Sequence, residues 1–337
     1  MARHGAAAYY YMFAVALALG VLAAIPAEVQ SIGVAYSVNG NGDGLPSASD
    51  MVKLYQSNGI TSMRLYFPDG DILRALGGTN ISLILDVGND QLASLAASAS
   101  SAASWVKANV QPHDDVNIKY ITVGNEVGGN DTENILPAMQ NMNGALSAAG
   151  LGGTIKVSTA VQSGVATGFP PSQGAFSASY IGTIAQYLAS TGAPLLANVY
   201  PYFSYVDNQP NIDINYALFT SPGAVVQDGD NAYQNLFDAL VDTFYSALES
   251  AGAGSVEVVV SESGWPSVGG TAATKANAQT YNQNLINHVG KGTSKRPGGI
   301  EAYIFAMFNE DNKTGAKTEK HFGLFNLDKS PAYPINF

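Results

Sequence analysis

The sequence predicts an α/β fold: a single-domain (β/α)8 TIM barrel. Short runs of β-branched and aromatic residues alternate along the chain with Ala-rich segments of helical spacing. This alternation is typical of βα units, in which parallel strands are joined by helices. Eight such units over a chain of this length favour closure into a barrel.

Eight short segments are expected to form the strands of the barrel. Each is rich in Val, Ile, Tyr or other residues that favour strands. In chain order they are Ile32 to Tyr36, Ser62 to Phe67, Ser82 to Val87, Ile118 to Val123, Ile155 to Ala160, Pro194 to Tyr200, Val256 to Ser261 and Glu301 to Phe308.

Amphipathic segments between these strands are expected to form helices that pack on the outside of the barrel. They are Ser49 to Ser57, Leu92 to Asn109, Asn134 to Ala149, Ser177 to Ser190, Tyr233 to Ser250 and Ala273 to His288. The longest connection, Tyr202 to Asn231, follows the sixth strand and is rich in Asn, Asp and aromatic residues. We interpret it as an elaborated loop region over the barrel rather than a second domain.

The first thirty residues have the layout of a secretory signal peptide. Arg3 and His4 precede an apolar run from Ala14 to Ile25, and small and polar residues follow. The run is shorter than the roughly 20 residues that span a membrane. We expect residues 1–30 to be removed, leaving residues 31–337 as the barrel domain, secreted to the extracellular space or cell wall and not attached to a membrane. A vacuolar destination stays open.

Composition excludes several classes of function. The formal net charge of -11 repels phosphate backbones, so nucleic acid is not expected as a partner, whereas a neutral polymer is indifferent to it. The chain has no cysteine, which excludes thiol chemistry and disulfides. Its four histidines lack the spacing of metal ligands. We expect a monomer without metal or cofactor.

Two glutamates lie where predicted strands end. The fourth strand runs into Gly124-Asn125-Glu126, and the seventh runs into Ser261-Glu262. In this architecture catalytic groups lie at the C-terminal ends of strands, and paired carboxyl groups across a cleft can hydrolyse a glycosidic bond. Either glutamate alone is more simply read as a helix cap or a partner of a lysine, but two at matching strand ends favour catalysis.

Longer strings around these glutamates resemble the plant β-1,3-glucanases of glycoside hydrolase family 17. The resemblance runs from Ile32 to Phe337 and is most specific around Glu262. It is carried by Gly124 to Val127, Ala197 to Phe203, Val258 to Ser267, Tyr303 to Glu310 and His321 to Phe325.

The resemblance implies an endo-hydrolase that retains anomeric configuration and acts on a β-glucan polysaccharide. Glu126 takes the acid/base position and Glu262 the nucleophile position. Asn125 is then expected to hydrogen-bond the sugar 2-hydroxyl, a contact that strengthens in the transition state.

The same resemblance implies a charged group on the loop after the eighth strand, made of Glu310, Lys313 and Glu319. Lys313 beside Glu262 would help to hold the nucleophile ionised, because a nearby cation lowers the pKa of a carboxyl group. The alternative for Glu310 and Glu319 is a solvated surface run.

Aromatic residues at or just past strand ends are candidate sugar contacts, because sugar rings stack on aromatic faces. These candidates are Tyr36, Tyr200, Phe203 and Trp265, with Tyr66 in a similar position. Packing in the core is the alternative for each of them.

The first βα loop departs from the family pattern. Ala35 replaces the usual Cys, Ser37 replaces the usual Gly, and Asn41 to Gly44 makes a looser, Gly-rich loop. We expect these changes to affect substrate preference or rate rather than the reaction itself.

Two other functions remain open. Mixed-linkage β-1,3;1,4-glucan is cut on the same scaffold, although Leu65 to Asp69 and Leu83 to Asp90 resemble the β-1,3-specific branch more. A defence protein that binds glucan with weak or no catalysis is the second.

Glycosylation sequons occur at Asn80, Asn130 and Asn312, and we expect Asn312, in the catalytic loop, to stay unmodified.

Overall fold

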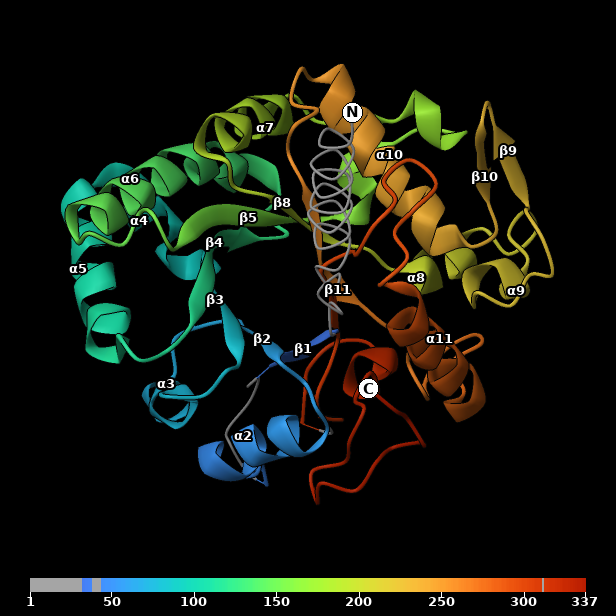
Figure 1. The fold of residues 1–337 in the computed structure, drawn as a ribbon, viewed down its shortest axis with the longest axis horizontal. Coiled ribbons are helices and arrows are strands. Elements are labelled where there is room, and N and C mark those ends of the chain that lie inside the picture. Colours follow the sequence, from blue (N-terminus) through green and yellow to red (C-terminus); the bar gives the residue numbers. More distant parts are fainter. Residues whose placement is uncertain (1–31, 38–43, 311) are drawn as a thin grey trace, which may run out of the picture. The chain divides into compact units, whose positions relative to one another are not determined.

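The computed structural model describes residues 32–37, 44–310 and 312–337. Within these ranges eight parallel strands close into a barrel in the order β1-β12-β11-β8-β5-β4-β3-β2, which confirms the predicted fold (Figure 1). The predicted signal peptide lies outside the described residues. The barrel strands are β1 (Gly33–Tyr36), β2 (Ser62–Leu65), β3 (Ser82–Val87), β4 (Ile118–Asn125), β5 (Lys156–Gln162), β8 (Leu195–Asn198), β11 (Val258–Ser263) and β12 (Ala302–Ile304).

Helices surround the barrel, as Figure 1 shows. Among the α-helices between barrel strands are α2 (Ala48–Ser57), α3 (Gly70–Leu76), α4 (Leu92–Ala97), α5 (Ala99–Asn109), α6 (Ile135–Ala148), α7 (Ser179–Thr191), α10 (Leu236–Ser250) and α11 (Lys275–His288). Short 3-10 helices are η1 (Asn89–Gln91), η2 (Gln111–His113), η3 (Gly129–Asn134), η4 (Ser163–Val165), η5 (Pro171–Gln173) and η6 (Lys317–Lys320). No helix in the described ranges is long and apolar enough to cross a bilayer.

One segment that was predicted as a single helix forms two helices. The segment from Leu92 to Asn109 breaks at Ser98, whose backbone is extended and whose Oγ accepts a hydrogen bond from the Ser101 amide. A serine with this geometry caps a new helix, because its side chain satisfies an amide that has no partner in the first turn. Helix α3, whose N-cap is Asp69, was not among the predicted elements.

The connection after the sixth barrel strand, β8, is an elaboration, as predicted. It contains α8 (Pro201–Asp207), α9 (Ile214–Ala217) and a ribbon of β9 (Val226–Asp228) and β10 (Asn231–Tyr233), which projects at the periphery in Figure 1. A second small ribbon, β6 (Ala166–Thr167) with β7 (Ala175–Phe176), follows β5.

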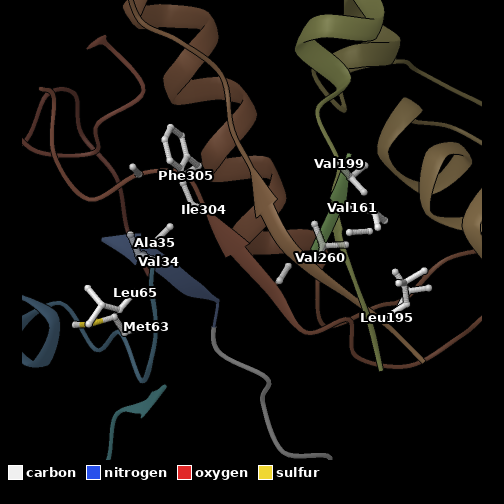
Figure 2. Packing of buried hydrophobic residues seen from close by; sticks show 14 of the residues in the cluster. Val34, Ala35, Met63, Leu65, Val161, Leu195, Val199, Val260, Ile304 and Phe305 are labelled. Atoms are coloured by element: carbon white, nitrogen blue, oxygen red, sulfur yellow. The ribbon is translucent and has the colours of Figure 1, made fainter. Parts of the chain in front are cut away.

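Alternation along the strands divides the apolar core into two clusters, because successive strand residues point to opposite faces. The larger cluster fills the space between barrel and helices, and Figure 2 shows part of it with Val161, Leu195 and Val260 from three neighbouring strands. The smaller cluster fills the barrel interior. Its members are Ile84, Tyr120, Ala160, Leu196, Val259 and Tyr303.

Candidate active site

Two adjoining cavities open at the C-terminal ends of the strands. The larger, of about 620 Å³, is lined by Glu126 and Phe203 among others, and the smaller, of about 320 Å³, by Asn125 and Lys313 among others. The residues common to both are Glu262, Phe305 and Glu319. We call the two cavities together the cleft. Both sequence-predicted glutamates therefore lie in one continuous site.

Local irregularities bring the two glutamates into the cleft. On β4 the register against β5 shifts between Thr122 and Asn125, and on β11 the register against β8 shifts between Val260 and Glu262. Such bulges re-aim side chains near active sites. Glu126 itself has a positive φ of 51°, a backbone conformation that costs energy in a residue other than glycine.

Glu262 is buried among hydrogen-bond donors, with 7% of its surface exposed. Its Oε1 accepts from Arg64 Nη1 at 2.9 Å and from the Tyr66 hydroxyl at 2.7 Å. Its Oε2 accepts from the Tyr200 hydroxyl at 2.7 Å. Burial and the Glu262 charge raise the pKa of both tyrosines well above the ordinary value, so both keep the proton that they donate. This set of donors suits a carboxylate anion.

Glu126 has different surroundings. Its side chain is open to the cleft, and the donor to its Oε1 is Asn198 Nδ2 at 2.9 Å. Desolvation by the surrounding cleft walls raises its pKa, and the Glu262 charge adds to the rise. The Asn198 hydrogen bond and the Arg64 cation oppose the rise without cancelling it. The protonated form of Glu126 is therefore favoured relative to a free glutamate.

Arg64 joins the polar groups beneath the cleft and is completely buried. Its Nη2 donates to Asp86 Oδ2 at 2.7 Å and to Asn125 Oδ1 at 2.9 Å, and its Nη1 donates to Asn198 Oδ1 at 3.0 Å and to Glu262. Burial alone lowers the pKa of Arg64, but Asp86 and Glu262 more than offset it and raise that pKa. A permanent cation therefore lies below both carboxyl groups.

Asn125 keeps one end of its amide for a ligand. Its Oδ1 accepts from Arg64 and from Asn198 Nδ2 at 3.1 Å, while Nδ2 has no acceptor within the described part of the chain. Asn125 also lines the smaller cavity. Its N–H groups are therefore available to a ligand, and the predicted hydrogen bond to a sugar hydroxyl stays a prediction.

The charged loop is arranged differently from the prediction. Lys313 and Glu319 both line the cleft, but Lys313 Nζ pairs with Glu319 Oε2 at 3.5 Å and lies 4.5 Å from the centroid of the Phe305 ring. The cation that pairs directly with Glu262 is Arg64, at 2.9 Å, and the described residues show no ion pair between Lys313 and Glu262. The influence of Lys313 on Glu262 stays a prediction. Arg64 lies on β2, and its buried side chain reaches Glu262 from inside the barrel.

Glu310, the third member of the predicted charged group, is buried rather than solvated. Its Oε1 accepts a hydrogen bond from the Ser37 hydroxyl. Ser37 also lines the smaller cavity, so the departure from the family pattern at this position reaches the cleft wall. The first βα loop continues from there into residues outside the described ranges.

The aromatic candidates divide into two groups. Phe203, 39% exposed, and Tyr200 line the larger cavity. Trp265 is fully buried, donates from Nε1 to the Ala272 carbonyl at 2.9 Å and packs on Tyr202, so its predicted contact with sugar is wrong. A Trp that follows a strand can pack into the core as well as face the cleft.

Tyr36 is also placed in the core. It is buried at the end of β1 and packs edge-on against Phe308, with ring centroids 6.0 Å apart. It is not among the residues that line the described cavities, so its predicted role as a sugar contact is not supported. Burial, with the charges of Asp69 and Glu310, raises the pKa of Tyr36 to about 12.

Sequence reasoning missed several residues of the site. Arg64, Asp86 and Asn198 all carry polar side chains inside strands whose neighbours are apolar. A charged or amide residue in an otherwise apolar strand is a usable signal, because burying it without partners is costly. Among the described residues, no three His, Asp or Glu side chains are grouped so as to hold a metal ion.

Comparisons with known proteins agree with this geometry. The model of glycosyl hydrolases family 17 matches residues 32–337. A Zea mays protein named glucan endo-1,3-beta-glucosidase, acidic isoform, is 70% identical, with 100% of both chains covered. Hordeum vulgare Lichenase-2 is 52% identical, covering 93% of this chain and 100% of its own.

A solved structure from work on two plant β-glucan endohydrolases with distinct substrate specificities has a TM-score of 0.88 and 52% identity. It covers 91% of this chain and 100% of its own. The family model spans the whole barrel, both glutamates and the charged loop. The chain therefore belongs to glycosyl hydrolases family 17.

Proposed function

We propose that this protein hydrolyses internal β-1,3-glucosidic bonds of a β-glucan, with retention of configuration, using Glu262 as nucleophile and Glu126 as acid/base. The observation that carries the proposal is the contrast between the two carboxyl groups. Glu262 accepts from Arg64 and two tyrosines, while Glu126 has a raised pKa in the same cleft. Two carboxyl groups with opposite environments divide the roles of base and acid.

In the first step the Glu262 carboxylate attacks the anomeric carbon while Glu126 gives its proton to the departing glycosidic oxygen. The Tyr66 and Tyr200 hydroxyls hold the carboxylate in place. In the second step Glu126, now ionised, takes a proton from a water that attacks the glycosyl-enzyme, and Glu262 is released. Free Asn125 N–H groups are available to the sugar 2-hydroxyl in both steps.

The substrate class is supported by the relatives and by the cleft. The Zea mays relative bears the name of an endo-1,3-β-glucosidase and matches this chain from end to end. The cleft is open along two adjoining cavities, which suits an internal segment of a polymer better than a chain end. Phe203 offers a partly exposed ring in the larger cavity for a sugar face.

Mixed-linkage β-1,3;1,4-glucan is the second candidate substrate. It is favoured by the 52% identity to a barley protein named as a lichenase. Both activities use the same pair of glutamates in this proposal, so the choice depends on the shape of the outer cleft.

The test compares wild type with Glu262→Gln on linear β-1,3-glucan and on mixed-linkage glucan, with reducing-sugar release as readout. We expect release mainly from β-1,3-glucan and a fall of about a thousandfold or more in the variant, because an amide cannot form the glycosyl-enzyme. Glu257→Gln is the matched control, since Glu257 binds Tyr245 away from the cleft.

Greater release from mixed-linkage glucan would select the second substrate. A folded wild type that binds glucan and releases sugar from neither polymer would overturn the hydrolase and leave a glucan-binding protein.

A further inference from the structure

Asn198 contacts the acid/base glutamate and the network beneath the nucleophile with the two ends of one amide group. We infer that it is a positioning residue that fixes the Glu126 carboxyl group and links it through Arg64 to Glu262. The inference rests on the proposed function, because it assigns Asn198 a part in the same reaction. Asn198 ends β8, the strand beside β11, and is 1% exposed.

The hydrogen bonds determine how the amide is oriented. Oδ1 accepts from Arg64 Nη1 at 3.0 Å and from the Ser261 hydroxyl at 2.8 Å. A guanidinium has donors only, so the atom facing Arg64 must be the oxygen and the NH2 group must face the other way. That NH2 group donates to Glu126 Oε1 at 2.9 Å and to Asn125 Oδ1 at 3.1 Å.

This contact holds one oxygen of Glu126 and leaves the other to the cleft. Within the described ranges Oε1 has the Asn198 donor, whereas no protein donor contacts Oε2, and Glu126 lines the larger cavity. The two oxygens therefore have separate tasks. Asn198 positions Oε1, and Oε2 is free to exchange a proton with the glycosidic oxygen or with water.

The contact also limits how basic Glu126 becomes. Desolvation by the cleft walls and the negative charges of Glu262 and Glu319 raise the pKa of Glu126, while the Arg64 cation and the Asn198 donor lower it. A donor to the charged form favours that form. Glu126 must be protonated in the first step and ionised in the second. Desolvation and the neighbouring negative charges favour the first state, and the Asn198 donor keeps the pKa of Glu126 low enough for the second.

The decisive variant is Asn198→Asp, which keeps the shape of the side chain and the acceptor for Arg64 and Ser261. It replaces the donor to Glu126 with a second carboxyl group. We expect the alkaline limb of the kcat/KM profile, where Glu126 loses its proton, to move to higher pH by about one unit or more. The hydrogen bond to the charged form is lost, and the new carboxylate repels the charge of Glu126. Asn198→Ala removes the donor without adding charge and should move the limb in the same direction by less.

Asn89→Asp is the matched control. Asn89 also lines the cleft and allows the same Asn-to-Asp change. Among the described residues, its side-chain amide hydrogen-bonds only to backbone atoms of Asn125, at 2.8 and 2.9 Å. We expect this variant to lose rate without a comparable shift of the alkaline limb. A merely structural role for Asn198 would give the same pattern in both variants.

A second readout needs no turnover. Titration of the Glu126 carboxyl carbon by NMR, assigned by its absence in Glu126→Gln, should show the same upward shift in Asn198→Asp. It tests the contact even if wild type cleaves no glucan, so failure of the inference and failure of the proposed function are separated. Wild-type and Asn198→Asp titrations that coincide, with thermal melting showing both proteins folded, would overturn the inference.

Discussion

The barrel interior has two layers that differ in chemistry although the same strands build both. Toward the N-terminal ends of the strands it is filled by the apolar layer that includes Ile84, Leu196 and Val259. Two residues further along these strands stand Asp86, Asn198 and Ser261, all buried and all polar. Residues two apart share a face, so each strand changes from packing to function within one repeat.

The two layers differ in how burial changes the free energy of folding. The apolar layer gains free energy from burial, while the polar layer loses solvation that its partners must restore. Arg64 restores much of it by pairing with Asp86 and Glu262 at 2.7 and 2.9 Å. Stability and chemistry are thus concentrated in adjacent layers, and substitutions in each should have separate signatures.

The largest effect should follow from Arg64→Met. This change leaves Asp86 and Glu262 buried without their cation, which costs about 3–5 kcal/mol of folding free energy. Hydrolysis should fall with it, because the carboxylate loses its partner. Urea unfolding and glucan hydrolysis measure the two losses, and Arg64→Lys should recover only part of each because an ammonium lacks the planar fork. Wild-type stability in Arg64→Met would contradict the role given to this layer.

A second prediction concerns the apolar layer. Leu196→Ala leaves a cavity inside the barrel and should cost about 2–5 kcal/mol of unfolding free energy. The kcat of the folded protein should stay within about threefold of wild type, because Leu196 belongs to the apolar layer and not to the polar one. A threefold change corresponds to less than about 1 kcal/mol of activation free energy. Unfolding curves and active-site-normalised rates give both numbers. A loss of kcat as large as the loss of stability would mean that the layers are not separable.

The smallest effect is expected from Tyr200→Phe. It removes one donor to Glu262 and should lower kcat/KM by about 10- to 100-fold, the scale of a hydrogen bond to a charged group. Stability should change little, since the ring stays in place. Tyr333→Phe is the control, because its hydroxyl bonds Asn282 away from the cleft and should not affect rate. Equal rates for the two variants would show that the Tyr200 hydroxyl does not assist Glu262 in the reaction.

Much of the fold was predictable, because the period of the apolar pattern is a local property. β3 has the predicted bounds, and both glutamates lie where strands end. The positions of Tyr36 and Trp265 were not predictable in this way. Whether a residue past a strand end faces the cleft or the core depends on the turn of the backbone there, which the strand pattern does not encode.

The polar residues of the site were not predicted from the sequence for another reason. Arg64 and Asn198 meet only after the barrel closes, since β2 and β8 lie far apart in the chain and across the barrel from one another. Their presence in apolar strands signalled buried polar contacts, but their partners could not be read from spacing. The break at Ser98 was missed because a capping serine looks like any polar residue on a helix surface.

The register shifts at the ends of β4 and β11 have a geometric consequence. A regular strand sends every second side chain inward, so a ring of eight strands offers few inward places at any one level. By inserting one extra residue, these two strands each present consecutive residues, Asn125 with Glu126 and Ser261 with Glu262, to the same opening. The mouth of the barrel thereby holds more functional groups than its circumference would otherwise admit.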